Sequence, residues 1–175
     1  KRQMTLNEVM GMPTTVGGIT YPGGPLEILV NNTKWNGTLP DGTIRSDFTP
    51  ISVGGVTTGY SELPREGETE VWEFINLTAD AHPMHLHLVQ FQLINRQKLD
   101  TKKYTAAYAA AYGGVVVDGY GPPLDYNAPN LDGAVGGNPA VGPYLKGPVL
   151  LPAANEAGWK DTVISYPGQV TRIAV

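Results

Sequence analysis

The chain holds three histidines, and all of them lie within six residues, at His82, His85 and His87. Neutral imidazole is the commonest protein ligand for copper and zinc, and three independent histidines would rarely fall so close together. His85 and His87 are two residues apart on an expected strand, so their imidazoles should project to the same face. Pro83 interrupts strand pairing, so we expect His82 to point elsewhere. The spacing therefore predicts metal binding rather than three structural histidines.

Other catalytic chemistries lack their usual sequence patterns. The chain contains no G-x-S-x-G nucleophile motif, no G-x-x-x-x-G-K-[ST] phosphate loop and no G-x-G-x-x-G dinucleotide pattern. Two carboxylate pairs lie in hydrophilic turn and strand contexts and are interpreted as solvated surface groups: Glu66 with Glu68, and Glu70 with Glu73. The chain has no Cys, which excludes disulfides, thiolate zinc sites and iron–sulfur clusters within it.

Length and composition narrow the class of protein further. A chain of 175 residues suits one domain, or one domain with a large insertion. The formal net charge of -4 argues against nucleic-acid binding, and no apolar run of about 18 residues is present to span a membrane. The 22 Gly and 15 Pro residues favour a β-rich domain with many loops over a helical one.

Apolar runs and alternation of apolar with polar residues predict several strands, since side chains of a strand point to opposite faces in turn. Five ranges are expected to form them: Pro25–Val30, Glu70–Leu77, Leu86–Asn95, Lys160–Tyr166 and Gln169–Val175. Pairs of turn-forming residues predict hairpin connections at Asp41-Gly42, Gly54-Gly55 and Pro167-Gly168.

The middle of the chain has a different pattern. An Ala-rich segment predicts a short helix over Thr101–Tyr112, ended by Gly113-Gly114. Tyrosines recur there at every fourth position from Tyr104, which favours a packing face over a binding strip. The following range, Gly113–Pro152, is rich in Gly, Pro, Ala and Asn. A loop of this length is uncommon inside a compact domain, so we interpret it as a functional excursion or a flap.

The histidine segment resembles a known motif. His82–Phe91 (HPMHLHLVQF) closely resembles the H-P-x-H-L-H motif of multicopper oxidases, the family of laccases, bilirubin oxidases and spore-coat laccases. Gly158–Val163 (GWKDTV) with Pro167–Val170 is similar to that family's G-W-K-D-T stretch and the strand after it. Leu29–Trp35 and Leu6–Glu8 are similar to earlier segments of its last domain. The resemblance covers nearly all of the chain apart from the Gly/Pro-rich excursion.

The resemblance implies an all-β fold, a cupredoxin-like Greek-key β-sandwich or barrel with a long Gly/Pro-rich excursion and a short helix. It implies that residues 1–175 are a single, partial C-terminal cupredoxin domain of a multicopper oxidase, with an insertion at about residues 100–157. Carried over by the motif, His82 is expected to bind the type 1 copper, His85 the type 2 copper and His87 a type 3 copper. One short segment would then contact both copper centres.

The resemblance also implies how the complete enzyme works. A phenolic, bilirubin-like or metal-ion donor gives single electrons to copper, and O₂ is reduced to water. The family supplies the type 1 thiolate from an H-C-H segment near the end of this domain, which this chain lacks. Lys1 and the unclosed strand at Val175 indicate cuts within a longer polypeptide. We therefore expect a fragment that is inactive alone and needs the remaining domains of the enzyme, with an extracellular, periplasmic or spore-coat location.

Other interpretations stay open. The chain could be a stand-alone cupredoxin-like module that holds Zn²⁺ or Cu²⁺ through the three histidines without oxidase activity, or a structural or interaction domain with no metal preference. A sandwich that lacks its last strand exposes a strand edge, so we also expect self-association or pairing with the rest of the polypeptide. We further expect Gly113–Pro152 to lie near the type 1 copper and to shape donor access.

Overall fold

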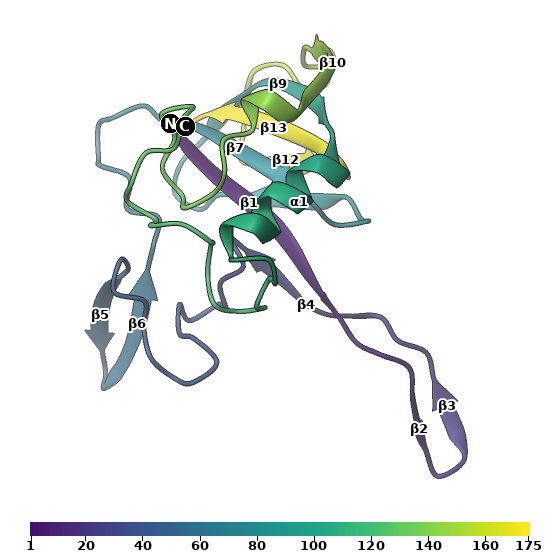
Figure 1. The fold of residues 1–175 in the computed structure, drawn as a ribbon. Coiled ribbons are helices and arrows are strands. Elements are labelled where there is room, and N and C mark those ends of the chain that lie inside the picture. The colour runs from purple at the N-terminus through teal and green to yellow at the C-terminus, as the bar shows by residue number, and fades with distance from the viewer.

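A seven-stranded sheet forms the centre of the computed structural model, which describes all residues from Lys1 to Val175. Its strands run in the order β10-β9-β13-β7-β1-β4, and β11 pairs beside β9. β1 and β7 are parallel, whereas the other neighbours are antiparallel. Both termini lie at the same end of the sheet, beside the start of β7 (Figure 1). The strands are β1 (Arg2–Met10), β4 (Pro25–Val30), β7 (Val71–Asn76), β9 (Phe91–Leu99), β10 (Leu145–Leu150), β11 (Trp159–Lys160) and β13 (Gln169–Ala174).

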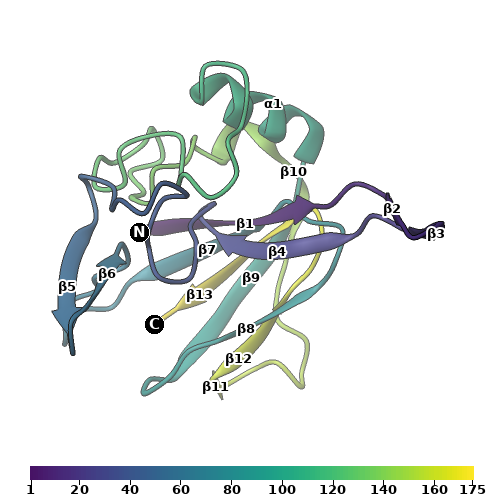
Figure 2. The same ribbon diagram turned by 90° about the horizontal axis from the view of Figure 1, so that it is seen from below.

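The two faces of this sheet are covered by different layers. A two-stranded sheet of β8 (His82–His85) and β12 (Thr162–Ser165) covers one face, and α1 (Thr101–Ala111) covers the other (Figure 2). Phe74 and Ile75 belong to different apolar cores because successive side chains of a strand point to opposite faces. The predicted all-β sandwich with one short helix is therefore confirmed.

Each layer buries its own apolar cluster against the sheet, and each large apolar side chain buried in this way contributes about 1.5–3 kcal/mol. The cluster on the β8–β12 side consists of Met4, Trp72, Phe74, Phe91, Leu93, Val163 and Ile173. The cluster on the α1 side consists of Ile75, Leu99, Tyr104, Tyr108, Val141 and Val170.

The predicted helix forms with nearly the predicted bounds. Asp100 caps its start, since its side chain accepts a hydrogen bond from a backbone N–H of the first turn. The helix ends at a glycine pair, where Gly114 has a φ of 113° and its N–H donates to the Ala109 carbonyl at 2.8 Å. Tyr104 and Tyr108 are almost fully buried. The tyrosine stripe is therefore a packing face, as predicted.

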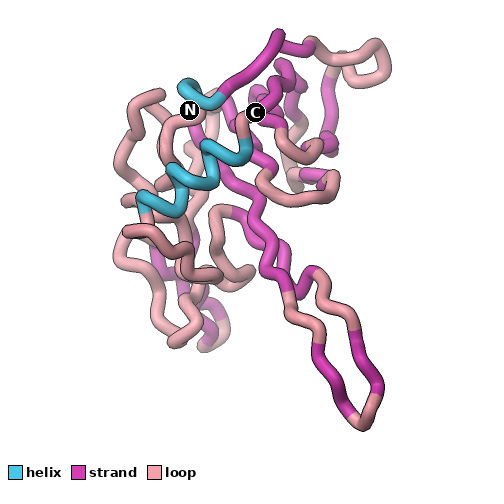
Figure 3. The backbone as a smooth tube through the Cα atoms, turned by 45° about the vertical axis from the view of Figure 1, so that its right-hand side comes forward, coloured by secondary structure: helices cyan, strands magenta, loops and turns pink.

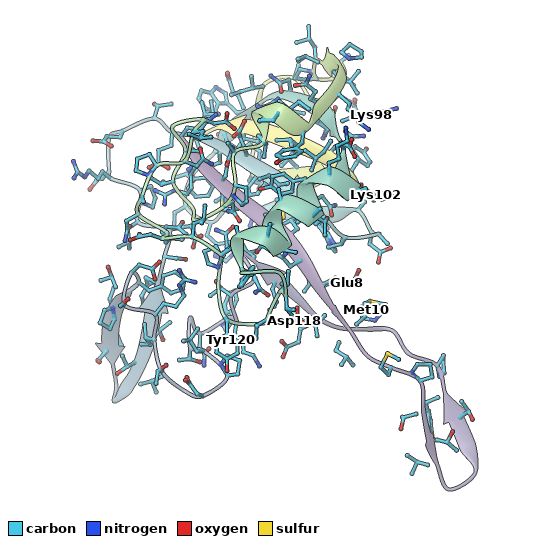
Figure 4. All side chains as sticks on the ribbon, viewed as in Figure 1. Glu8, Met10, Lys98, Lys102, Asp118 and Tyr120 are labelled. Carbon is cyan, nitrogen blue, oxygen red and sulfur yellow. The ribbon has the colours of Figure 1, made fainter.

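Two hairpins extend away from the large sheet. The first is an arm formed by β2 (Thr14–Val16) and β3 (Ile19–Tyr21), which continues β1 and β4 outward and projects beyond the rest of the molecule (Figure 3). Met10 lies where the arm leaves the sheet, with its side chain largely exposed (Figure 4). The second hairpin pairs β5 (Thr49–Val53) with β6 (Val56–Tyr60).

Two predicted hairpin turns are present outside the large sheet. Gly54 and Gly55 connect β5 to β6 with φ values of 60° and 82°, which glycine adopts without steric cost. The turn at Asp41-Gly42 is closed by an antiparallel bridge between Thr38 and Ile44. The structure contains no helix with the length and hydropathy that crossing a membrane requires.

Buried asparagines hold the excursion against the large sheet. Asn138 donates to the Gln3 carbonyl at 3.0 Å and to the Asn31 side-chain oxygen at 2.9 Å. Residues 113–141 lie on the α1 side, away from β8 (Figure 2). The expectation that the whole excursion lies near His82 is therefore wrong, because amide hydrogen bonds from β1 and the end of β4 hold its first part elsewhere. Its last part is not a loop, since β10 pairs with β9.

Two predicted strands are interrupted in the structure. The alternation over Leu86–Asn95 predicts one strand, but β8 ends at His85 and β9 begins at Phe91. Between them Leu88 has a φ of 67°, a left-handed conformation that breaks an extended strand. The strand predicted over Lys160–Tyr166 is likewise divided between β11, which pairs with β9, and β12, which pairs with β8.

The interpretation of Glu70 and Glu73 as solvated groups is wrong. Glu73 is 2% exposed and accepts a hydrogen bond from Arg172 Nε at 2.6 Å. Glu70 accepts two hydrogen bonds from Arg2, both at 2.9 Å. Each carboxylate is paired because the sheet places an arginine of β13 or β1 beside β7. Glu66 and Glu68 are exposed, as predicted.

Thr171 offers a test of the core of this sheet. Its side chain is fully buried in β13, and its hydroxyl has no hydrogen-bond partner. Thr171→Val is expected to raise the free energy of unfolding by about 1 kcal/mol, because it removes an unpaired buried polar group without changing shape. Urea denaturation measures this effect. Thr5→Val is the matched control and is expected to lower stability, since the Thr5 hydroxyl donates to Asn7 Oδ1 at 2.8 Å.

Candidate metal centre

β8 carries the first two histidines and pairs with a single neighbour, β12. His82 lies opposite Ser165, and His85 lies opposite Thr162. Pro83 does not interrupt this pairing, contrary to the prediction, and lies within β8. Proline is tolerated because β8 has one open edge, where a nitrogen without a hydrogen needs no partner. The two histidines therefore belong to the same short strand.

His85 and His87 lie side by side, although His87 follows the end of β8. Their ring centroids are 5.0 Å apart, with an interplanar angle of 63°. His85 Nδ1 lies 2.8 Å from the Asp161 carbonyl oxygen and 3.0 Å from Thr162 Oγ1. A carbonyl oxygen only accepts hydrogen bonds, so Nδ1 carries the hydrogen and Nε2 keeps a free lone pair that could bind a metal. The structure thus brings these two predicted ligands together and orients one of them.

His82 lies apart from this pair. Its Nε2 is 2.7 Å from the hydroxyl oxygen of Thr78, which is itself buried. Nowhere in residues 1–175 do three His, Cys, Asp or Glu side chains come together as a possible metal site. The three histidines therefore form a pair and a single residue, an arrangement suited to supplying two different centres. A closed three-ligand site within this chain, as a stand-alone metal module requires, does not form.

The histidine pair lines an open surface. A shallow hollow of about 370 Å³ includes both His85 and His87, together with Asp161. A deeper groove of about 480 Å³ begins at His85 and runs over the sheet face that β8 and β12 leave uncovered, where Trp72 and Phe74 line it. His85 and His87 are exposed, so their nitrogens are accessible to ligands and to other polypeptide segments.

Several residues around the histidines carry no role in the sequence prediction. Thr78 contacts His82, and Asp161 with Thr162 contacts His85. Asp161 and Thr162 belong to the G-W-K-D-T stretch, which could have indicated a role beside the ligands. No comparable signal identified Thr78, because its contact depends on how the loop after β7 folds.

An ion pair supports β12 from the side away from β8. Arg96 donates to both carboxylate oxygens of Glu156, at 2.6 and 3.0 Å, and also to the Ile164 carbonyl in β12. Arg96 is 6% exposed. Its hydrogen bonds hold the pKa of Glu156 below the usual value. The ionised carboxylate thus fixes the arginine that binds the strand opposite His82 and His85.

The Glu156 pair predicts a pH-dependent contribution to stability. Because its folded pKa lies below its unfolded pKa, the contribution is complete above the unfolded pKa and is lost as pH falls through the folded pKa. Glu156→Gln should lower the free energy of unfolding at neutral pH by about 1 kcal/mol and weaken the acid dependence. Denaturation from neutral to acidic pH measures both. Glu66→Gln, at an exposed residue without an ion-pair partner, is expected to change neither.

Comparison with known proteins identifies the family of this chain. A family model described as multicopper oxidase matches residues 57–175, which is more than half of the chain. The chain belongs to the multicopper oxidase family. The matched range contains all three histidines and the G-W-K-D-T stretch, so the predicted resemblance is confirmed there. A copper cofactor is accordingly what this family implies for the domain.

Individual multicopper oxidases match part of the chain. The laccase of Bacillus subtilis is 31% identical over 114 residues, 65% of this chain and 16% of the laccase. Multicopper oxidase LPR1 of Arabidopsis thaliana is 34% identical over 115 residues, 66% of this chain and 16% of LPR1. The chain is also similar to the crystal structure of the McoA multicopper oxidase from Aquifex aeolicus, with a TM-score of 0.41 and 19% identity over 99% of this chain and 22% of McoA. The match thus spans a small part of each of these longer proteins.

Proposed function

We propose that this multicopper oxidase domain supplies copper ligands to a laccase-like oxidoreductase. His82 binds the type 1 copper, His85 the type 2 copper and His87 a type 3 copper. The observation that carries the proposal is the separation of the three imidazoles into a pair and a single residue on one short segment. A segment that serves one metal would bring its ligands together, whereas a segment between two centres must direct them apart.

The residues present fit copper in their chemistry. His85 keeps Nε2 free because its other nitrogen donates to the Asp161 carbonyl, and such contacts orient a ligand before the metal binds. His87 lies beside it and is open to solvent. Met84 and Leu86 pack against the apolar cluster under β8 and hold the segment against the large sheet. When bound, copper supplies one-electron transfer from a donor and the reduction of O₂ to water.

The remaining ligands come, in this proposal, from other segments of the same enzyme. His85 and His87 are exposed, and His85 borders the uncovered groove, which suits an approach of further polypeptide to this face. The isolated chain then lacks oxidase activity. Donors of phenolic, bilirubin-like or metal-ion type, and an extracellular, periplasmic or spore-coat location, belong to the same proposal. Self-association of the isolated chain through its open strand edges is a further expectation.

Metal content and oxygen uptake test the proposal. The complete enzyme is expected to bind copper and to consume O₂ with phenols, bilirubin or ferrous iron as donors. The 175-residue chain is expected to show neither O₂ uptake nor an intense blue colour. Tight stoichiometric Cu²⁺ or Zn²⁺ binding by the chain alone, lost on replacement of its three histidines and resistant to a chelator, would instead support the stand-alone module.

A further inference from the structure

The hydroxyl of Thr78 has a full set of hydrogen-bonding neighbours. Its oxygen lies 2.8 Å from Asn76 Oδ1, 3.1 Å from the Asp80 carbonyl and 2.7 Å from His82 Nε2. The Asp80 N–H donates to the same oxygen at 3.3 Å. A hydroxyl donates one hydrogen and accepts two, so these neighbours decide which atom beside Thr78 must be a donor.

The orientation of the Asn76 amide is fixed by its other contacts. Its Nδ2 donates to the Asp80 carbonyl at 2.8 Å and to the Ser165 carbonyl at 2.9 Å. Its Oδ1 accepts from the backbone N–H of Thr78 at 2.9 Å. A flipped amide would face two carbonyls with its oxygen and a donor with its nitrogen. Asn76 is fully buried, so water could not replace the hydrogen bonds that a flipped amide would lose.

The hydrogen of Thr78 must therefore go to an oxygen. Asn76 Oδ1 and the Asp80 carbonyl only accept, so the Thr78 hydrogen has to lie between its own oxygen and one of these two, because oxygens in contact without a hydrogen repel each other. If its hydrogen went to His82 instead, the hydroxyl oxygen would lie 2.8 Å from Asn76 Oδ1 with no hydrogen between them. The contact to His82 is then an Nε2–H donating to Thr78. The imidazole carries its hydrogen on Nε2 and its lone pair on Nδ1.

We propose that Thr78, held by Asn76, is a positioning residue that fixes His82 in the Nε2–H tautomer and leaves Nδ1 as its metal-binding nitrogen. The role toward metal rests on the proposed function of His82. His85 is fixed in the opposite tautomer, with Nε2 free. Neighbouring ligands on one strand thus present different nitrogens, which sets different distances from the backbone to each metal. This difference helps one short segment supply two centres.

Nuclear magnetic resonance of the ¹⁵N-labelled 175-residue chain tests the proposal without metal. Two-bond proton–nitrogen correlations, recorded where the imidazoles are neutral, distinguish the two tautomers. The unmodified chain and Thr78→Ser should show His82 as the Nε2–H form. Thr78→Val should show a mixture of both forms, because valine keeps the shape of threonine but accepts no hydrogen bond. His85 should keep its Nδ1–H form in all three proteins.

The chain itself provides a matched control. Thr38 donates to Asn36 Oδ1 at 2.6 Å, and its N–H donates to the same atom at 3.1 Å, so Asn36 and Thr38 repeat the Asn76–Thr78 turn without a histidine. Thr38→Val is expected to leave His82 in a single tautomer. An Nδ1–H form of His82 in the unmodified chain would overturn the proposal, and this measurement requires no variant. A pure Nε2–H form in folded Thr78→Val would also overturn it.

Copper binding by the complete enzyme separates this proposal from the proposed function. Thr78→Val should lower its affinity for the type 1 copper by about 10- to 100-fold, the loss typical of contacts that orient a ligand, and Thr78→Ser should restore it. If the tautomer changes as expected while the copper spectrum and affinity stay the same, the type 1 role of His82 is overturned, and the tautomer assignment stands. If neither changes, the role of Thr78 is overturned.

Discussion

Asn32→Ala is expected to lower the free energy of unfolding by about 3–5 kcal/mol, one of the largest single-residue effects in the chain. Asn32 is fully buried, and its Nδ2 lies 2.7 Å from both the Tyr112 hydroxyl and the Val117 carbonyl. Its Oδ1 accepts from the Gly119 N–H at 3.0 Å. Alanine would leave these groups unpaired in the interior. It would also adopt a φ of 50°, which asparagine tolerates better than alanine.

The loss of Asn32 should destabilise the neighbouring segment in particular, in addition to lowering the stability of the whole chain. The Asn32 side chain makes three hydrogen bonds to residues 113–121, with Val117, Gly119 and Gly121, so limited proteolysis and hydrogen exchange should show this segment opening first. Asn32→Gly separates the two contributions, because glycine removes the side chain but accepts the positive φ. Asn36→Ala, at an exposed residue, is the control and should cost less than about 1 kcal/mol. Equal stability of Asn32→Ala and Asn36→Ala would contradict the structural role assigned to Asn32.

Some of the regular elements could be predicted because their signals are local. Alternation identified β7 and β13, and the Ala-rich segment with its glycine end identified α1. The prediction of one continuous strand over Leu86–Asn95 is wrong, because the alternation of apolar and polar residues does not reveal that Leu88 adopts a positive φ. The prediction that Glu73 is solvated fails for a different reason. Its partner Arg172 is 99 residues away in the sequence, and the two side chains come together only because β13 pairs with β7.

The histidine cluster could be identified from the sequence, but its surroundings could not. The type and spacing of the three histidines are visible in the sequence. Which ring nitrogen of each histidine is free depends on hydrogen-bond partners from elsewhere in the chain. Asp161 reaches His85 because β12 pairs with β8. Thr78 is near His82 in sequence, but its hydroxyl acts as an acceptor only because Asn76 is locked by the Ser165 carbonyl. Such hydrogen-bond directions follow from the folded structure.

Removal of single histidines from the complete enzyme is expected to have the largest functional effects. His82→Ala and His85→Ala should each lower donor-dependent O₂ consumption by more than about 100-fold, the upper limit of losses from orienting contacts alone. The two variants should lose activity for different reasons. In the structure His82 contacts Thr78, whereas His85 lies beside His87, so each variant should disturb a different centre. Optical and paramagnetic resonance spectra with copper content distinguish the two outcomes.

The spectra then decide whether this segment serves two centres. His82→Ala should lose the intense blue absorption and keep the type 2 resonance signal, whereas His85→Ala should do the reverse. Met84→Leu is the matched control, because Met84 lies between them on β8, packs against the apolar cluster and tolerates a swap of similar volume. Loss of the same signal in both histidine variants would contradict two separate centres. Since β8 holds both histidines at fixed positions opposite β12, a difference between the variants would come from the ligands and not from the strand.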